Sequence, residues 1–513
     1  MNGAESLIRT LAGAGIDVCF ANPGTTELHL VQALDEAGSI RAVPGLFEGV
    51  CSAAADGYAR MAGRPAMTLL HLGPGVANAL ANFHNARRAR TPVVSVVGEH
   101  VRGHRGLGAP LDADIETLVG PVSKWVRTSA TAAALAHDGA EAVAAATSPP
   151  GGVATLIVPA DCAWEEAEGP APPQPAVAPA AVSDSAVDAA RTALSASRPA
   201  ALLLGGNGLS ERGLRAVRRV ASATDCHLFS ETFPARMERG GALPAPRRLP
   251  YFPQEATAAL APASSLVLAG APAPVSFFGY PGVPSELAPP GMPVVQLAAP
   301  EQDVADALER LAEHLGAPDG RLRPPQMPGD MPAGPLTPAI AGQVLAAVQP
   351  EGAIVVDESV TLSAHYFAAS AVTPRHTYLA LTGGAIGQGL PSAAGAAVAC
   401  PDRPVIALQA DGSAMYTLQA LWTHAREGLD VTSLICANGS YEILVEELDR
   451  AGVPEPGPQA RAMTSLTDPP LDWVALAGGM GVPATRATTA EELADALARA
   501  LAEPGPQLVE MVL

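Results

Sequence analysis

Two polar residues each lie just past a short apolar run in the last third of the chain. Asp411 follows residues 405–408, which have the length and composition of a buried strand, and Asn438 follows a second such run at 431–436. Open α/β sheets hold ligands beyond the carboxyl ends of their strands, so we expect these two residues to share a site. Carboxylate and amide oxygens are ligands that Mg²⁺ prefers. A helix cap is the alternative interpretation of Asp411 taken alone.

Two titratable residues end predicted strands in the first third of the chain. Glu48 follows a strand at 41–46 and opens a helix of small residues, and His71 ends a strand at 66–71. A carboxyl in an apolar pocket can be tuned by desolvation, and an imidazole can exchange protons near neutral pH. The alternatives are a helix-start residue for Glu48 and a core histidine for His71.

Strand and helix signals alternate through the whole chain, which predicts an α/β fold of three doubly wound parallel-sheet domains. We place the domains at residues 1–165, 184–315 and 336–513. Tracts rich in proline, at 165–183 and 316–335, predict the linkers between them. A Gly-Gly-Asn-Gly loop at 205–208 could hold a nucleotide phosphate, but it lacks the full dinucleotide fingerprint, which favours a plain turn.

Composition excludes several classes of function. The 513 residues carry a formal net charge of −20, so a nucleic-acid partner is not expected. No apolar run reaches the ~18 residues needed to span a bilayer, and the N-terminus has no signal-peptide pattern. The six cysteines show no pairing pattern. Together these features predict a cytoplasmic protein.

The chain resembles the thiamine-diphosphate enzymes. The resemblance rests on Asp411-Gly412 followed one βαβ unit later by Asn438, on Glu48 before its small-residue helix, and on the three-domain order. It is closest to benzoylformate decarboxylase and to the acetolactate synthase large-subunit group. The chain departs from the family pattern at Ala410, where glycine is usual, and at Ala437, where a second asparagine is frequent.

The resemblance implies a set of cofactor-binding residues. For a metal it implies Asp411, Asn438 and Ser440. For the remainder of thiamine diphosphate it implies Glu48, Ser359, Thr361, Gly384, Ile386, Gly412, Ser413 and Tyr441. Glu48 would favour the reactive tautomer of the aminopyrimidine, the Gly384 carbonyl would accept from its amine, and Ile386 would be the apolar wedge beneath the cofactor. Capping is a nearly equal interpretation of Ser359 and Thr361.

The implied substrate pocket differs from that of benzoylformate decarboxylase. His71 matches a catalytic histidine of that enzyme, and Thr25 stands where it has a serine. Its second histidine is missing, and Phe277 and Phe278 occupy that segment. Ile443 and Glu447 fall where that enzyme lines an aromatic pocket; Glu447 could instead face solvent.

These features predict a Mg²⁺/thiamine-diphosphate enzyme that decarboxylates a small 2-oxo acid. Transfer of the remaining fragment to a second carbonyl, as in acetolactate synthase, is slightly favoured over protonation to an aldehyde. A flavin-using oxidase and a non-catalytic regulatory relative remain alternatives, although FAD is not favoured because no clear FAD-binding sequence is present. The family also implies a homodimer or homotetramer with active sites at the subunit interface.

Overall fold

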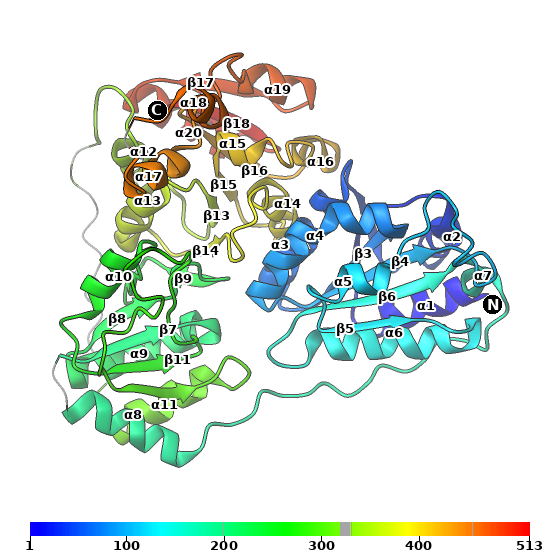
Figure 1. Ribbon diagram of the computed structural model, residues 1–513, viewed down its shortest axis with the longest axis horizontal. Helices are drawn as coiled ribbons and strands as arrows, with labels where there is room; N and C mark the ends of the chain where they lie inside the picture. The colour runs from blue at the N-terminus through cyan, green and yellow to red at the C-terminus, as the bar shows by residue number, and fades with distance from the viewer. Residues whose placement is uncertain (197–198, 319–328, 330, 454) are drawn as a thin grey trace.

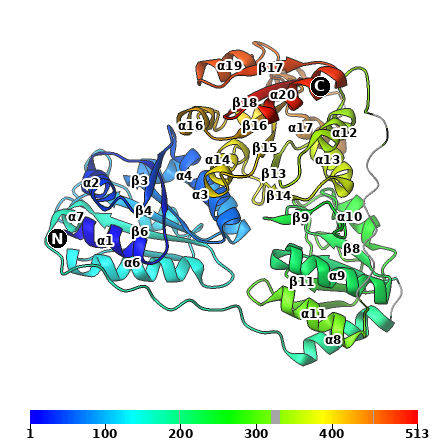
Figure 2. The ribbon, with the colours of Figure 1, turned by 180° about the vertical axis from the view of Figure 1, so that it is seen from behind.

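The computed structural model describes residues 1–196, 199–318, 329, 331–453 and 455–513. The chain forms three lobes, each built on a β-sheet (Figure 1). The first lobe runs from blue to cyan in the figure, the second is green, and the third runs from yellow to red. Seen from behind, the first lobe lies at the left, the third at the upper right and the second at the lower right (Figure 2).

The first lobe is organised around a parallel sheet with the strand order β2-β1-β3-β4-β6-β5. Its strands are β1 (Val18–Asn22), β2 (Arg41–Pro44), β3 (Ala66–His71), β4 (Val93–Glu99), β5 (Trp125–Thr128) and β6 (Val153–Pro159). Its helices are α1 (Gly3–Gly13), α2 (Leu28–Ala37), α3 (Glu48–Ala62), α4 (Leu72–Ala89), α5 (Ile115–Val119), α6 (Ala132–Thr147) and α7 (Ala160–Trp164). Helices cover both faces of the sheet, which explains why its central strands read as unbroken apolar runs.

The second lobe has a parallel sheet with the order β10-β8-β7-β11-β12. Its strands are β7 (Ala201–Leu204), β8 (His227–Ser230), β10 (Arg247–Arg248), β11 (Leu266–Ala269) and β12 (Val294–Ala298), and its helices are α8 (Asp184–Ala196), α9 (Glu211–Thr224), α10 (Pro253–Leu260) and α11 (Val304–His314). The chain between Trp164 and Asp184 contains no helix and runs as a long strap to α8 (Figure 1). Most of the second predicted linker, 319–328 and 330, lies outside the described residues.

The third lobe holds a mostly parallel sheet with the order β17-β18-β16-β15-β13-β14-β9. Its strands are β13 (Ile354–Glu358), β14 (His376–Ala380), β15 (Val405–Ala410), β16 (Val431–Ala437), β17 (Ala484–Ala487) and β18 (Gln507–Val512). Its helices are α12 (Pro338–Val348), α13 (Ser363–Ala369), α14 (Gly389–Ala399), α15 (Asp411–Ala414), α16 (Ala420–Glu427), α17 (Glu442–Arg450), α18 (Pro458–Thr464), α19 (Trp473–Gly479) and α20 (Ala490–Ala502).

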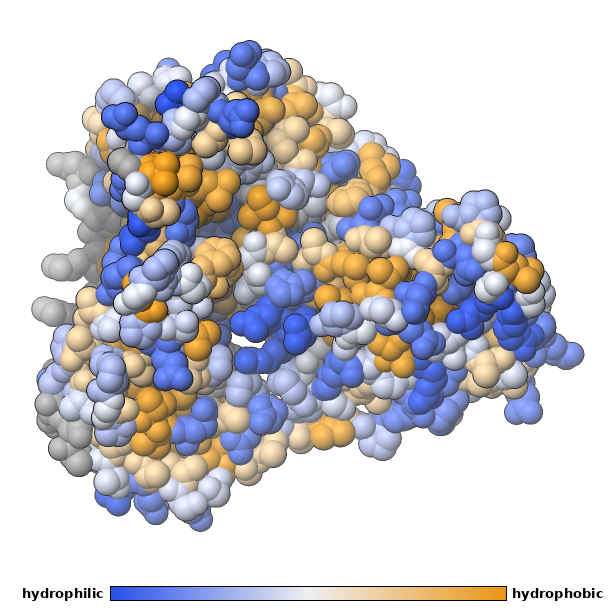
Figure 3. Space-filling view, in the orientation of Figure 1, coloured by the Kyte–Doolittle hydropathy of each residue, from blue (hydrophilic) through white to orange (hydrophobic). Residues whose placement is uncertain are grey.

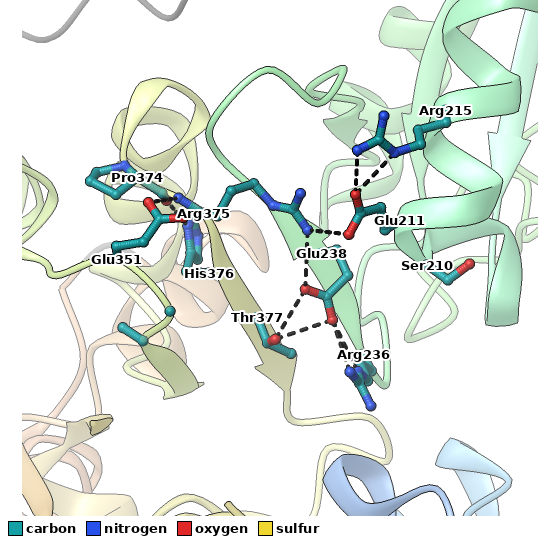
Figure 4. A network of polar contacts seen from close by, with 12 residues as sticks. Ser210, Glu211, Arg215, Arg236, Glu238, Glu351, Pro374, Arg375, His376 and Thr377 are labelled. Atoms are coloured by element: carbon teal, nitrogen blue, oxygen red, sulfur yellow. Dashed lines mark hydrogen bonds and ion pairs between the residues drawn. The ribbon is translucent and has the colours of Figure 1, made fainter. Parts of the chain in front are cut away.

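One edge of this third sheet comes from the middle of the chain. The strand β9 (Met237–Arg239) pairs antiparallel with β14. Around it, Glu238 accepts hydrogen bonds from Thr377 at 3.1 Å, and Arg375 bridges to Glu211 on α9 at 3.0 Å (Figure 4). Hydrogen bonds from Arg375 and Arg215 together lower the pKa of Glu211 to about 2. The second and third lobes are therefore joined by strand pairing and by ion pairs.

The first and third lobes meet through α3 and α14, whose glycines allow close backbone approach. A Cβ atom at Gly395 would lie 1.9 Å from the carbonyl oxygen of Ala54, and one at Gly57 would lie 2.1 Å from that of Ser392. The run of small residues after Glu48 is thus explained by helix packing as well as by any role in the active site.

The exposed face shown in Figure 3 mixes hydrophilic and apolar patches and has an opening between the first and second lobes. Within the described parts of the chain, no helix combines the length and apolarity that crossing a bilayer requires.

Candidate active site

Asp411 and Asn438 lie side by side because β15 and β16 are parallel neighbours in register, with Ala410 opposite Cys436. Asp411 is 2% exposed, and burial raises its pKa. Its Oδ1 accepts from the amide of Gly412 and its Oδ2 from the amide of Gly439, both at 2.8 Å. The bond from Gly439 links the loop after β15 to the loop after β16.

The metal donors available here are few. The Oδ1 atom of Asn438 accepts from the amide of Ser440 at 3.0 Å, which orients the asparagine side chain. The described residues contain no cluster of three or more His, Cys, Asp or Glu side chains suited to a metal. One carboxylate and one amide oxygen nevertheless fit Mg²⁺, which usually retains waters and phosphate oxygens as its other ligands.

The small residues around Asp411 are tightly packed. A Cβ atom at Gly412 would lie 2.5 Å from the Tyr441 ring, so this ring lies directly over the Gly412 backbone. The Ser413 hydroxyl donates to the carbonyl of Ala410 at 3.1 Å and accepts from Gln409 at 2.7 Å. The hydroxyl proton of Ser413, which a diphosphate oxygen would need, is therefore already donated within the protein.

In the loop after β13, the Ser359 hydroxyl is hydrogen-bonded to Asp357 and is not free to bind a ligand. Ser359 is fully buried and donates through its hydroxyl to Asp357 at 2.7 Å. Val360 has a φ of +53°, an uncommon conformation for a β-branched residue. Strained backbone of this kind is concentrated at functional sites, and here it adjoins Thr361, which is half-buried.

The predicted aminopyrimidine loop, 383–387, is held by α4 of the same chain. His84 contacts the carbonyl of Gly383 at 3.1 Å, and Asn85 donates to the carbonyl of Ala385 at 2.7 Å. Between them, the Gly384 carbonyl accepts no hydrogen bond from the described residues. Gly384 is exposed and Ile386 is half-buried.

Glu48 lies at the start of α3, where it is half-buried beside α4. Its Oε2 accepts from the Asn78 amide nitrogen at 2.9 Å. A Cβ atom at Gly75 would lie 3.0 Å from Oε1 of Glu48, so glycine leaves room for the carboxylate. The side chain is therefore oriented by two residues that follow β3.

His71 is paired with a buried carboxylate. Its Nδ1 lies 2.8 Å from Oε2 of Glu27, whose side chain is fully buried, and 3.2 Å from the Thr26 hydroxyl. Glu27 is anchored in turn by the amide of Gly24 at 2.7 Å. The next residue, Leu72, has a φ of +51°, so the backbone turns sharply after His71. With Nδ1 occupied, Nε2 is the nitrogen left for a substrate.

The structure places the neighbouring Thr25 differently from Thr26. Thr25 is exposed, and its hydroxyl makes no hydrogen bond to the described residues, whereas Thr26 contacts His71. Gly24, which precedes Thr25, packs closely against the His71 ring. A Cβ atom at Gly24 would lie 2.5 Å from that ring.

The predicted pocket residues of the second and third lobes approach one another. Phe277 lies over Gly384, where a Cβ atom would lie 2.4 Å from its ring, and Phe278 is 54% exposed. Ile443 is half-buried on α17. Glu447, on the same helix, accepts from the Tyr280 hydroxyl at 2.8 Å, so its carboxylate is engaged by the second lobe.

An acidic side chain from another segment packs against the first residue of the glycine-rich loop of the second lobe. A Cβ atom at Gly205 would lie 2.0 Å from Oε1 of Glu231, which follows β8. Burial raises the pKa of Glu231 to about 7, opposed by Arg90, Gly206 and Arg88. When Glu231 is ionised, its negative charge disfavours phosphate binding at this loop. This agrees with the interpretation of the loop as a turn.

Comparison with known proteins gives the family. A model described as the N-terminal TPP binding domain of thiamine pyrophosphate enzymes matches residues 1–118, and one described as their C-terminal TPP binding domain matches 359–511. The chain is 51% identical to IlvX of Mycobacterium tuberculosis, which carries the provisional name acetolactate synthase large subunit, over 100% of this chain and 99% of that one. The chain belongs to the thiamine pyrophosphate enzyme family.

Two further comparisons place this thiamine pyrophosphate enzyme near the decarboxylases. Benzoylformate decarboxylase of Pseudomonas aeruginosa is 31% identical, over 97% of this chain and 96% of that enzyme. The solved structure of the thiamine diphosphate-dependent 4-hydroxybenzoylformate decarboxylase of Rhodococcus jostii RHA1 superposes with a TM-score of 0.88, at 27% identity, over 100% and 99% of the two chains. The predicted resemblance and fold class are confirmed, and the enzyme is related to both groups.

Sequence reasoning missed several residues of this thiamine pyrophosphate enzyme's site. Glu27, Asn78 and Asn85 orient His71, Glu48 and the aminopyrimidine loop, respectively. Glu27 could have been noticed, because it ends the Pro-Gly-Thr-Thr-Glu segment that precedes a helix. The two asparagines carry no such signal, because their partners are far away in the sequence.

Proposed function

We propose that this enzyme uses thiamine diphosphate and Mg²⁺ to decarboxylate a 2-oxo acid and that His71 protonates the product carbon to give an aldehyde. The observation that carries the proposal is the contact between His71 and buried Glu27. The buried carboxylate holds Nδ1 and fixes the ring orientation, which leaves Nε2 positioned to donate a proton.

The other residues have binding roles in this proposal. Asp411 and Asn438 would hold Mg²⁺, which would offset the charge of the diphosphate, and the Gly384 carbonyl would accept from the aminopyrimidine amine. Glu48 would hydrogen-bond to a nitrogen of that ring. Thiamine diphosphate, when bound, supplies the electron sink for loss of CO₂.

A second candidate is ligation of the decarboxylated fragment to another carbonyl compound. It is supported by the identity to IlvX and was slightly favoured by the sequence. The pairing of His71 with Glu27 favours protonation instead, because a positioned proton donor competes with an acceptor carbonyl at the same carbon.

We also propose that two copies of the chain share each active site. Glu48 begins α3, whereas Arg60 near the end of that helix donates to Thr382 at 3.0 Å, just before the aminopyrimidine loop. Twelve residues of helix separate Glu48 from Arg60, which corresponds to about 18 Å. This separation supports a role for Glu48 on a cofactor held by a second copy.

The test is CO₂ release from a panel of pyruvate, 2-oxobutyrate and benzoylformate, with product identification. The protein is first stripped of cofactor and then assayed with or without thiamine diphosphate and Mg²⁺. We expect cofactor-dependent release and an aldehyde product, with a loss of at least about 100-fold in Glu48→Gln. A 2-hydroxy ketone as the main product would support ligation, and absence of both release and cofactor binding would refute the catalytic assignment.

A further inference from the structure

A buried carboxyl group, Glu358, holds the C-terminal end of the predicted aminopyrimidine loop. Glu358 is the last residue of β13 and is 3% exposed. Its Oε1 accepts from the amide of Gly387 at 2.6 Å, and its Oε2 accepts from the amide of Gly389. No Lys, Arg or His among the described residues forms an ion pair with it.

These contacts connect the strand to both the end of the loop and the start of a helix. Gly389 is the first residue of α14, so its amide is one of the donors that a helix leaves without an internal partner. The helix dipole favours a carboxylate in this place. Gly387 has a φ of +96°, and its carbonyl accepts from the Thr417 hydroxyl at 2.7 Å. The last residue of the loop is therefore fixed at both its amide and its carbonyl.

We propose that Glu358 is a positioning residue for thiamine diphosphate: by clamping Gly387 and Gly389, it fixes the Gly384 carbonyl and the Ile386 side chain in the places where the aminopyrimidine is bound. This inference rests on the proposed function. The first lobe supports the loop through His84 and Asn85, and the third lobe, which carries Asp411, supports it through Thr417 and Glu358. Of these side chains, Glu358 is the one that accepts from the backbone amides of both Gly387 and Gly389.

Burial of a carboxylate without a cation is costly, which explains why its hydrogen bonds matter. Burial raises the pKa of Glu358 to about 7, and the bonds from Gly387 and Gly389 oppose this rise. Replacement by glutamine keeps the size but offers only one acceptor oxygen, so one of the two amides would face an NH₂ group and lose its partner.

The test compares two probes on stripped protein by calorimetry with Mg²⁺: thiamine diphosphate, which contacts the loop, and inorganic diphosphate, which does not. We expect Glu358→Gln to weaken thiamine diphosphate binding about 10- to 100-fold and to leave inorganic diphosphate within about twofold. Glu510→Gln is the matched control, because Glu510 is a buried glutamate of the same sheet, paired with Arg486 at 2.9 Å. It should change neither affinity.

Equal weakening of both probes would show that Glu358 only maintains the fold, and no weakening would show that the clamp is irrelevant; either result overturns the inference. A wild-type protein that binds no thiamine diphosphate would instead refute the proposed function. If Glu358→Gln does not fold, amide hydrogen exchange on the cofactor-free wild-type protein tests the clamp instead. Slow exchange at Gly387 and Gly389 supports the clamp, and exchange at the rate of an exposed loop overturns it.

Discussion

The Nδ1 atom of His71 lies 2.8 Å from a carboxylate oxygen of Glu27, a side chain with no solvent exposure. Glu27 comes from the loop after β1 and His71 from the end of β3, and these strands are neighbours in the sheet. The partly exposed His71 side chain is thereby held in one ring orientation, with Nε2 directed away from the buried acid.

Glu27→Gln should reduce the rate of aldehyde formation without weakening cofactor binding. The amide has nearly the same shape but gives Nδ1 a neutral partner that holds the ring less firmly, so we expect kcat to fall about 10- to 100-fold. Steady-state kinetics with calorimetric binding of thiamine diphosphate measure both quantities. Glu36→Gln, at an exposed position on α2, is the control. An unchanged kcat would show that Glu27 does not support His71 in catalysis.

Mixing two inactive variants should restore activity if two copies share each site. Glu48→Gln and Asp411→Asn would each be inactive as homodimers. In a mixed dimer, one site carries both substitutions and the other carries neither. Random exchange makes about half of the dimers mixed, so about a quarter of all sites become intact. The assay is cofactor-dependent CO₂ release after subunit exchange. If activity stays at the level of the separate variants although mixed dimers have formed, Glu48 serves a cofactor within its own chain.

Removal of Arg60 should destabilise the packing of the three lobes. Arg60 and Asp56 form a buried bidentate pair, with bonds of 2.9 and 2.6 Å. Arg60 also donates to the carbonyls of Ala380 at 2.8 Å and Ala235 at 3.2 Å. Arg60→Met leaves a buried carboxylate without its cation, which typically costs about 3–5 kcal/mol.

Urea denaturation measures this loss of stability as a lower urea concentration at the unfolding midpoint of Arg60→Met. Arg64→Met is the matched control, because Arg64 pairs with Asp17 on the surface and exposed pairs contribute at most about 1 kcal/mol. Equal shifts in the two variants would contradict a structural role for the buried pair. The double variant Asp56→Leu/Arg60→Met should recover part of the loss, because it leaves neither charge unpaired.

Glu231→Gln should stabilise the protein at pH 8 but not at pH 4.5. The folded protein holds the Glu231 proton up to about pH 7, because burial raises this pKa from 4.5. Between these values the folded state binds a proton that the unfolded state has released, so stability falls as pH rises through this window and the loss is complete above it. Glutamine removes the ionisation.

Thermal unfolding at the two pH values tests this prediction. The melting temperature of Glu231→Gln should exceed that of the wild type by a few degrees at pH 8, with no such gain at pH 4.5. Glu313→Gln, at an exposed position on α11, should have the same melting temperature as the wild type at both pH values. A gain of the same size at both pH values would show that the effect of the substitution is not electrostatic.

The sequence by itself determined the α/β fold class, the main strands and the positions at their carboxyl ends. The strand ending at His71 and the strand preceding Asp411 were readable because parallel strands buried on both faces become continuous apolar runs. Polar residues just after such runs fall at the ligand-binding edge of the sheet, so the local pattern was enough to pair Asp411 with Asn438. The family resemblance rested on these same positions.

Only the tertiary structure decided which side chains meet across the lobes. Glu447 is engaged by Tyr280, and β9 completes a sheet that belongs to another part of the chain. Thr26, the neighbour of the residue singled out from the sequence, contacts His71. The physical reason is that a hydrogen-bond partner is chosen by backbone orientation and lobe packing, which depend on contacts between residues far apart in the chain. Local residue pattern places a side chain at the edge of a sheet but does not select its partner.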